Sequence, residues 1–220
     1  MKLQIPLLFF LVSIILYSCE PEIKENERTA IQGTVIDFEG NTIPNIPIKV
    51  KTQNLLLGEG TTDNIGSFKF TSLQSKFDEL SINVNTEGGN SSFGTYSIIY
   101  SKKPLQQGYN LSDITLRRKA TLAFNIEKTS SENNTLNWSL QYTEPFCEVY
   151  NDEETSQNTS RCYETTSLIE VLDTTNPNFE SEIFSVQNST VQFTYQLNDA
   201  EPQTILIELT EATNFYEFEY

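Results

Sequence analysis

Alternation of apolar and polar residues with a period of two is the feature that most limits how this 220-residue chain can fold. Successive side chains of a β-strand point to opposite faces, so such runs predict strands with one buried face. Two of the clearest runs carry Ile46, Ile48 and Val50, and Leu136, Trp138 and Leu140. Turn residues separate these runs from their neighbours. The pattern predicts an all-β protein with two antiparallel β-sandwich domains in tandem.

The first sandwich is expected over residues 29–117, with about seven strands. Its motifs occur in the order Gly33 to Gly40, Ile43 to Ile48, and Thr61 to Phe68. This order resembles the carboxypeptidase regulatory-like domain, a transthyretin-like β-sandwich. The resemblance implies a module for folding, spacing or docking that carries no catalytic residues of its own.

A short stretch in this unit, Asp63 to Gly66, could be taken for part of a calcium loop. A calcium loop needs several more oxygen ligands at fixed spacings and a terminal Glu, which Ser67 to Ser75 do not supply. The stretch instead predicts a turn in which Asp63 bonds its own backbone and Gly66 takes a positive φ.

The second sandwich is expected over residues 118–220, after a basic joint of three residues, Arg117 to Lys119. No family is recognised in this half. The run Thr166 to Leu172 fits either a strand or a short helix. Trp138 stands in an alternating run, which favours a place in the core over a role in binding a ligand.

Cys147 and Cys162 are left as a pair once Cys19 is assigned to lipid, as described below. In an exported chain such a pair predicts a structural disulfide. A redox or metal role is disfavoured because the chain has neither a Cys-x-x-Cys spacing nor a histidine. The sequence therefore predicts no metal site and no cofactor.

The loop closed by this disulfide is the strongest candidate for a ligand-binding site in the second half of the chain. Aromatic side chains beside carboxylates can stack on sugars or hold basic peptides. The candidate ligand-contact residues are Tyr150, Asp152, Glu153, Glu154 and Tyr163. The alternative is a disulfide-bound hairpin that only protects a sheet edge.

The N-terminal residues 1–18 have one lysine, a short apolar core and a small residue before Cys19, which is typical of an export signal. Leu16 to Cys19 resembles the lipobox of bacterial lipoproteins. The resemblance implies cleavage before Cys19 and acylation of that residue, which attaches the protein to a membrane. The alternative is an ordinary secretory signal with an incidental cysteine.

Residues 19–28 are polar and charged, and they are expected to form an acidic tether. Glu20 and Glu22 are similar to the acidic residues that direct some lipoproteins to the outer leaflet, although a merely solvated spacer fits equally well. The expected location is the bacterial outer membrane, facing either the surface or the periplasm.

Charge and composition exclude several classes of function. The chain has 30 acidic and 14 basic residues, which disfavours nucleic-acid binding. The absence of histidine removes Ser-His-Asp and Cys-His catalysis.

We therefore expect a non-enzymatic, lipid-anchored envelope protein that presents two sandwiches for binding or assembly, with an envelope protein or a glycan as partner. The alternatives are an accessory subunit of an outer-membrane transport or secretion complex and, less favoured, a carboxylate-dependent glycoside hydrolase.

Overall fold

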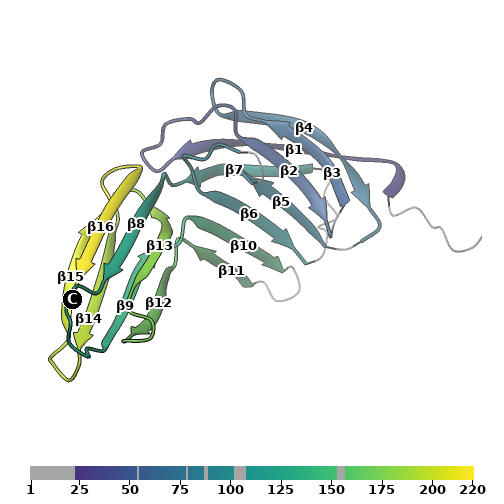
Figure 1. Cartoon of the computed structure of the whole chain (residues 1–220). Coiled ribbons are helices and arrows are strands. Elements are labelled where there is room, and N and C mark those ends of the chain that lie inside the picture. The colour runs from purple at the N-terminus through teal and green to yellow at the C-terminus, as the bar shows by residue number, and fades with distance from the viewer. Residues whose placement is uncertain (1–22, 54, 78, 87–88, 102–107, 153–156) are drawn as a thin grey trace, which may run out of the picture.

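The computed structural model describes residues 23–53, 55–77, 79–86, 89–101, 108–152 and 157–220. Within these ranges the regular structure consists of sixteen β-strands and no helix (Figure 1). The predicted all-β class with tandem sandwiches is confirmed. The predicted signal and the lipid attachment at Cys19 lie outside the described residues.

The first sandwich contains seven strands in two sheets. Its strands are β1 (Ile23–Asp37), β2 (Pro47–Thr52), β3 (Leu55–Thr61), β4 (Ser67–Ser75), β5 (Leu80–Val84), β6 (Thr95–Tyr100) and β7 (Gly108–Leu116). One sheet has the order β4-β1-β7, and the other includes the order β6-β5-β2-β3. All pairs are antiparallel except β1 with β7, which is parallel.

The second sandwich also contains seven strands in two sheets. They are β8 (Lys119–Glu127), β9 (Leu136–Thr143), β12 (Thr165–Leu172), β13 (Phe179–Val186), β14 (Thr190–Leu197), β15 (Gln203–Glu208) and β16 (Thr213–Glu219). The sheets have the orders β13-β8-β16 and β12-β9-β14-β15. The segment that fitted either a strand or a helix is therefore strand β12.

The two sandwiches have the same topology, which the sequence did not suggest. In each, the first strand lies at the centre of a three-stranded sheet, antiparallel to the fourth strand of its sandwich and parallel to the last. The other four strands follow the same order in both sandwiches, third-second-fifth-sixth. The chain thus contains one seven-stranded arrangement twice.

One hairpin interrupts the second copy of this arrangement. Strands β10 (Phe146–Asp152) and β11 (Gln157–Cys162) are inserted between β9 and β12. Strand β10 pairs in parallel with β6 of the first sandwich, so this sheet has six strands in the order β11-β10-β6-β5-β2-β3 (Figure 1). The sequence grouped residues 146–162 with the second sandwich, whereas their backbone hydrogen bonds extend the first.

The beginning of the first sandwich also differs from the expected boundary. Strand β1 begins at Ile23, inside the segment expected to be a tether, and Ile23 pairs with Ser75 of β4. A register shift separates this pair from the regular ladder that begins at Arg28. Charged side chains can continue a ladder beyond the core because the backbone alone makes the hydrogen bonds.

Each sandwich has its own core. The first is mainly aliphatic, with Ile31, Val35, Ile46, Ile48, Val50 and Ile82 almost completely buried. The second is built around the ring of Phe124, whose centroid lies 5.7 Å from Trp138, 5.2 Å from Phe193 and 5.9 Å from Tyr216. Trp138 is therefore a core residue, as its alternating run predicted.

The turn predicted at Asp63 forms as expected. The Oδ1 atom of Asp63 accepts hydrogen bonds from the backbone N–H groups of Ile65 at 3.0 Å and Ser67 at 2.9 Å. Gly66 has a φ of 72°, and an added Cβ would lie 2.6 Å from the carbonyl oxygen of Val35. The residues from Asp63 to Gly66 thus form a tight turn between β3 and β4.

Candidate functional site

The inserted hairpin is closed at its base by a disulfide. Cys147 and Cys162 lie directly opposite each other in the β10-β11 ladder and are joined, as the sequence predicted. Just before Cys147, the carbonyl oxygen of Pro145 accepts a hydrogen bond from the N–H of Thr95, and a Cβ on Gly94 would collide with that same oxygen. The hairpin is thus held at its base both covalently and by close contact with the first sandwich.

Tyr163 ties the base of the hairpin to the joint between the sandwiches. Its hydroxyl donates to the carbonyl oxygen of Thr115 at 2.9 Å and accepts from the backbone N–H of Arg117 at 3.2 Å. Burial raises the pKa of this phenol, and the nearby Arg117 partly opposes the rise. The hydroxyl of Tyr163, a predicted ligand-contact residue, is thus used in two hydrogen bonds to the backbone.

The other predicted contact residues lie elsewhere on the hairpin. Tyr150 is three positions further along the ladder than the disulfide, and its exposed hydroxyl donates to Glu148 at 3.3 Å. Asp152 ends strand β10 opposite Gln157. Glu153 and Glu154 lie outside the described residues. The role of these residues in ligand contact stays a prediction.

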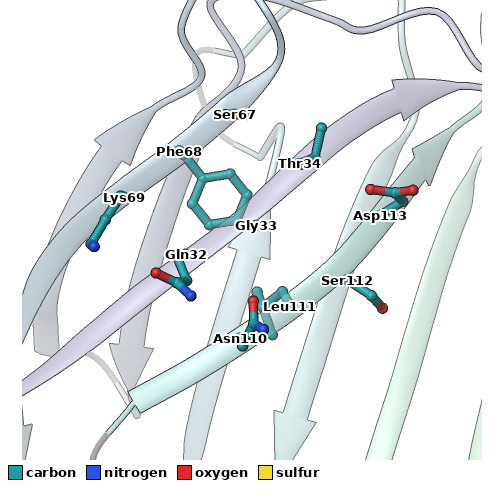
Figure 2. A pocket seen from close by; sticks show the side chains of 10 residues that line it. All are labelled: Gln32, Gly33, Thr34, Ser67, Phe68, Lys69, Asn110, Leu111, Ser112 and Asp113. Carbon is teal, nitrogen blue, oxygen red and sulfur yellow. The ribbon is translucent and has the colours of Figure 1, made fainter.

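A shallow hollow of about 450 Å³ opens on the outer face of the sheet β4-β1-β7 (Figure 2). It lies where β7 carries an extra residue: Gln32 pairs with Asn110, but Thr34 pairs with Asp113. Such a bulge locally disrupts a ladder and re-aims its side chains. No sequence pattern indicates this hollow, because the bulge depends on the pairing of two distant strands.

The chemistry of this hollow is polar and mixed. Figure 2 shows the amides of Gln32 and Asn110, which extend from neighbouring strands, with Lys69 on one side of them and the carboxylate of Asp113 on the other. These groups can both donate and accept hydrogen bonds. Asp113 is the one carboxylate in its lining, so the hollow lacks the carboxylate pair that glycoside hydrolysis uses.

The basic joint forms a second, smaller hollow where β7 passes into β8. Each of its cations lies over an aromatic ring. The distances to the ring centroids are 4.4 Å from Arg117 to Phe38, 5.0 Å from Arg118 to Phe93, and 5.8 Å from Lys119 to Phe184. Cation–π contacts of this kind stabilise the charged groups and orient them. The sequence showed the three charges but not their aromatic partners.

Among the residues that the structure describes, no group of three or more His, Cys, Asp or Glu side chains is arranged to hold a metal ion. The described segments also contain no helix long and apolar enough to span a membrane.

No known protein family matches the sequence, and no curated protein matches it significantly. Solved structures with a similar arrangement include the Bacillus anthracis TIE protein (TM-score 0.34, 12% identity, 89% of this chain and 34% of that chain). They also include a streptococcal ancillary pilin (0.30, 10%, 89% and 63%) and a putative cell adhesion protein from Bacteroides ovatus (0.30, 11%, 89% and 93%). This chain spans less than two thirds of the first two proteins. Structural similarity at these TM-scores does not support a conclusion about function.

Proposed function

We propose that this protein is a non-enzymatic, lipid-anchored protein of the bacterial outer membrane that presents two joined β-sandwiches for binding or assembly. The observation that carries the proposal is the pairing of β10 with β6, which joins the two sandwiches through backbone hydrogen bonds in addition to the covalent joint. A unit of this kind holds its surfaces in a defined relation to each other, which suits a display or assembly role.

Two further observations support the location. The disulfide of the hairpin suits an oxidising compartment outside the cytoplasm. The lipobox-like residues before Cys19, preceded by an export-type signal, supply the proposed attachment. Neither observation depends on the identity of the partner.

Assembly with a partner protein is supported by apolar side chains on an exposed strand. Ile169 and Val171 are 72% and 54% exposed at successive outward positions of β12, which is an edge strand of its sheet. An edge strand presents backbone N–H and C=O groups that can pair with another chain. A glycan is the second candidate partner, favoured by the hydrogen-bonding groups of the hollow in Figure 2.

The proposal is tested in cells that produce the full-length protein and, as a matched control, the Cys19→Ser variant. We expect the natural protein to incorporate labelled fatty acid and to partition into the detergent phase, and the variant to do neither. Protease added to intact cells should degrade the natural protein, and crosslinking should then identify its neighbours.

Equal fatty-acid labelling of both proteins would contradict attachment at Cys19. Survival of the protein on intact cells, with loss only after the outer membrane is permeabilised, would contradict surface display. For the glycan alternative, the variant Gln32→Ala with Asn110→Ala should lose binding to a glycan array that the natural protein retains.

A further inference from the structure

The small hollow at the joint between the sandwiches contains two arginines with unused hydrogen-bond donors. We propose that Arg117 and Arg118 bind a carboxylate carried by an apolar residue of a partner polypeptide. The inference rests on the geometry of the joint and does not require that the protein be lipid-anchored or displayed on the surface.

Both guanidinium groups lie over aromatic rings. The Cζ atom of Arg117 lies 4.4 Å from the ring centroid of Phe38 and 5.4 Å from that of Tyr163, and the Cζ atom of Arg118 lies 5.0 Å from Phe93. A guanidinium has five N–H donors, and contact with a ring leaves most of them free to bind an anion. Within the described part of the chain, neither guanidinium has a hydrogen bond or an ion pair.

This lack of partners is unexpected in so acidic a chain. With 30 carboxylates and 14 basic residues, an acidic partner is available for most cations. Two basic residues elsewhere do have one: Lys24 contacts Glu27 at 3.3 Å and Arg161 contacts Glu164 at 3.5 Å. Arg117 is half-buried and Arg118 is exposed, so a ligand can reach the pair from solvent.

A hollow of about 100 Å³ lies against both arginines and is also lined by Phe38, Glu39, Val186 and Gln187. A water molecule takes up about 30 Å³ in the liquid, so the hollow accommodates a group as small as a carboxylate. The planar fork of an arginine matches the two oxygens of a carboxylate. The largely exposed ring of Phe38 adds apolar surface next to the charge, which favours a carboxylate attached to an apolar body.

The walls of the hollow are held in place by hydrogen bonds. The Oδ1 atom of Asp37 accepts from the backbone N–H groups of Glu39 at 3.0 Å and Asn41 at 2.8 Å, which fixes the turn that carries Phe38. On the opposite wall, the N–H of Gln187 donates to the carbonyl oxygen of Arg118 at 2.9 Å. A preorganised site loses less entropy when it binds a ligand.

Charge selects a carboxylate over a more highly charged anion. The whole chain has a net charge of −16, which repels polyanions at long range. A single carboxylate carries one charge and is repelled least. Glu39 lines the same hollow and adds a negative charge there, so neutralising it should strengthen binding.

The test uses the full chain purified in mild detergent and follows the arginine Nε–Hε resonances by NMR. The probes are sodium acetate, N-acetylphenylalanine, its neutral amide, and inorganic phosphate. We expect saturable shifts with acetate, tighter binding of N-acetylphenylalanine because of its ring, and no binding of the amide. Tighter binding of phosphate than of N-acetylphenylalanine would overturn the assignment to a carboxylate.

Variants separate the site from nonspecific charge effects. Arg118→Gln should weaken binding of N-acetylphenylalanine about tenfold or more, which corresponds to the loss of one charge-assisted pair. Glu39→Gln should strengthen binding, and Arg28→Gln, an exposed arginine outside the hollow, should leave it unchanged. If no probe gives saturable shifts, or if Arg28→Gln weakens binding as much as Arg118→Gln, the proposal is wrong.

Discussion

Removal of the inserted hairpin tests whether it holds the two sandwiches together. The N–H of Glu144 donates to the carbonyl oxygen of Glu164 at 2.9 Å, so the ends of the insertion already form a hydrogen-bonded pair between β9 and β12. Replacing residues 145–163 with Asn-Gly should therefore close this pair with a two-residue turn. The variant then has two uninterrupted copies of the same seven-stranded arrangement.

The free energy that the hairpin contributes can be estimated from the backbone hydrogen bonds between β10 and β6 that the deletion removes. Six residues of β10, Phe146 to Asn151, pair with β6, which corresponds to about six backbone hydrogen bonds. At about 1 kcal/mol net for each bond, the pairing contributes roughly 6 kcal/mol. This is comparable with the 5 to 15 kcal/mol that typically stabilise a whole domain, so the loss is large enough to uncouple the two sandwiches.

Differential scanning calorimetry measures the effect. We expect the natural protein to unfold in one transition and the deletion variant in two. The transition of the first sandwich should shift down by at least about 25 °C, because about 4 to 8 °C accompany each kcal/mol in a domain of this size. A single transition at an unchanged midpoint in the variant would refute the coupling through β10.

The remaining predictions concern substitutions at one or two positions, and each is measured by urea or pH unfolding. Replacing both Cys147 and Cys162 with Ser should lower the free energy of unfolding by about 3 kcal/mol in the chain-entropy model while leaving one transition, and reductant should act on the natural protein in the same way. Gly33→Ala should cost about 2 kcal/mol or more, because its Cβ would lie 2.5 Å from a backbone carbonyl oxygen of β7. Gly40→Ala should cost only about 1 kcal/mol for its positive φ, since nothing lies within 4 Å of that position. Burial raises the pKa of Tyr163 above 10.0, so the folded protein holds the phenol proton more tightly than the unfolded chain. This tighter proton binding adds to the free energy of unfolding below about pH 10, and the added stability is lost as the pH rises through the folded pKa. Tyr163→Phe should therefore make the loss of stability at alkaline pH less steep. An equally steep alkaline loss in this variant would show that other groups cause it.

Local pattern was sufficient for the strands and their buried faces. The alternation around Ile48 and around Trp138 predicted which side chains face the core, because the direction of a side chain depends only on its position along its own strand. The turn at Asp63 was predictable for the same reason, since its bonds join residues within four positions. The disulfide was predictable by counting cysteines and not from any feature of the loop.

The hairpin and the joint could not be placed in the same way. Nothing in Phe146 to Asn151 distinguishes pairing with β6 from pairing with a strand of the second sandwich, because backbone donors and acceptors are alike at every edge. The rings under Arg117 and Arg118 come from Phe38 and Phe93, which are distant in sequence.

The sequence by itself determined that this chain forms strands, which of their residues are buried, and which two cysteines are available to pair. Only the tertiary structure decided that the strands repeat one topology twice, that an insertion in the second copy extends a sheet of the first, and that the cations of the joint lie on aromatic rings. The physical reason is that strand formation is a local property, whereas pairing and stacking depend on which segments become neighbours in space.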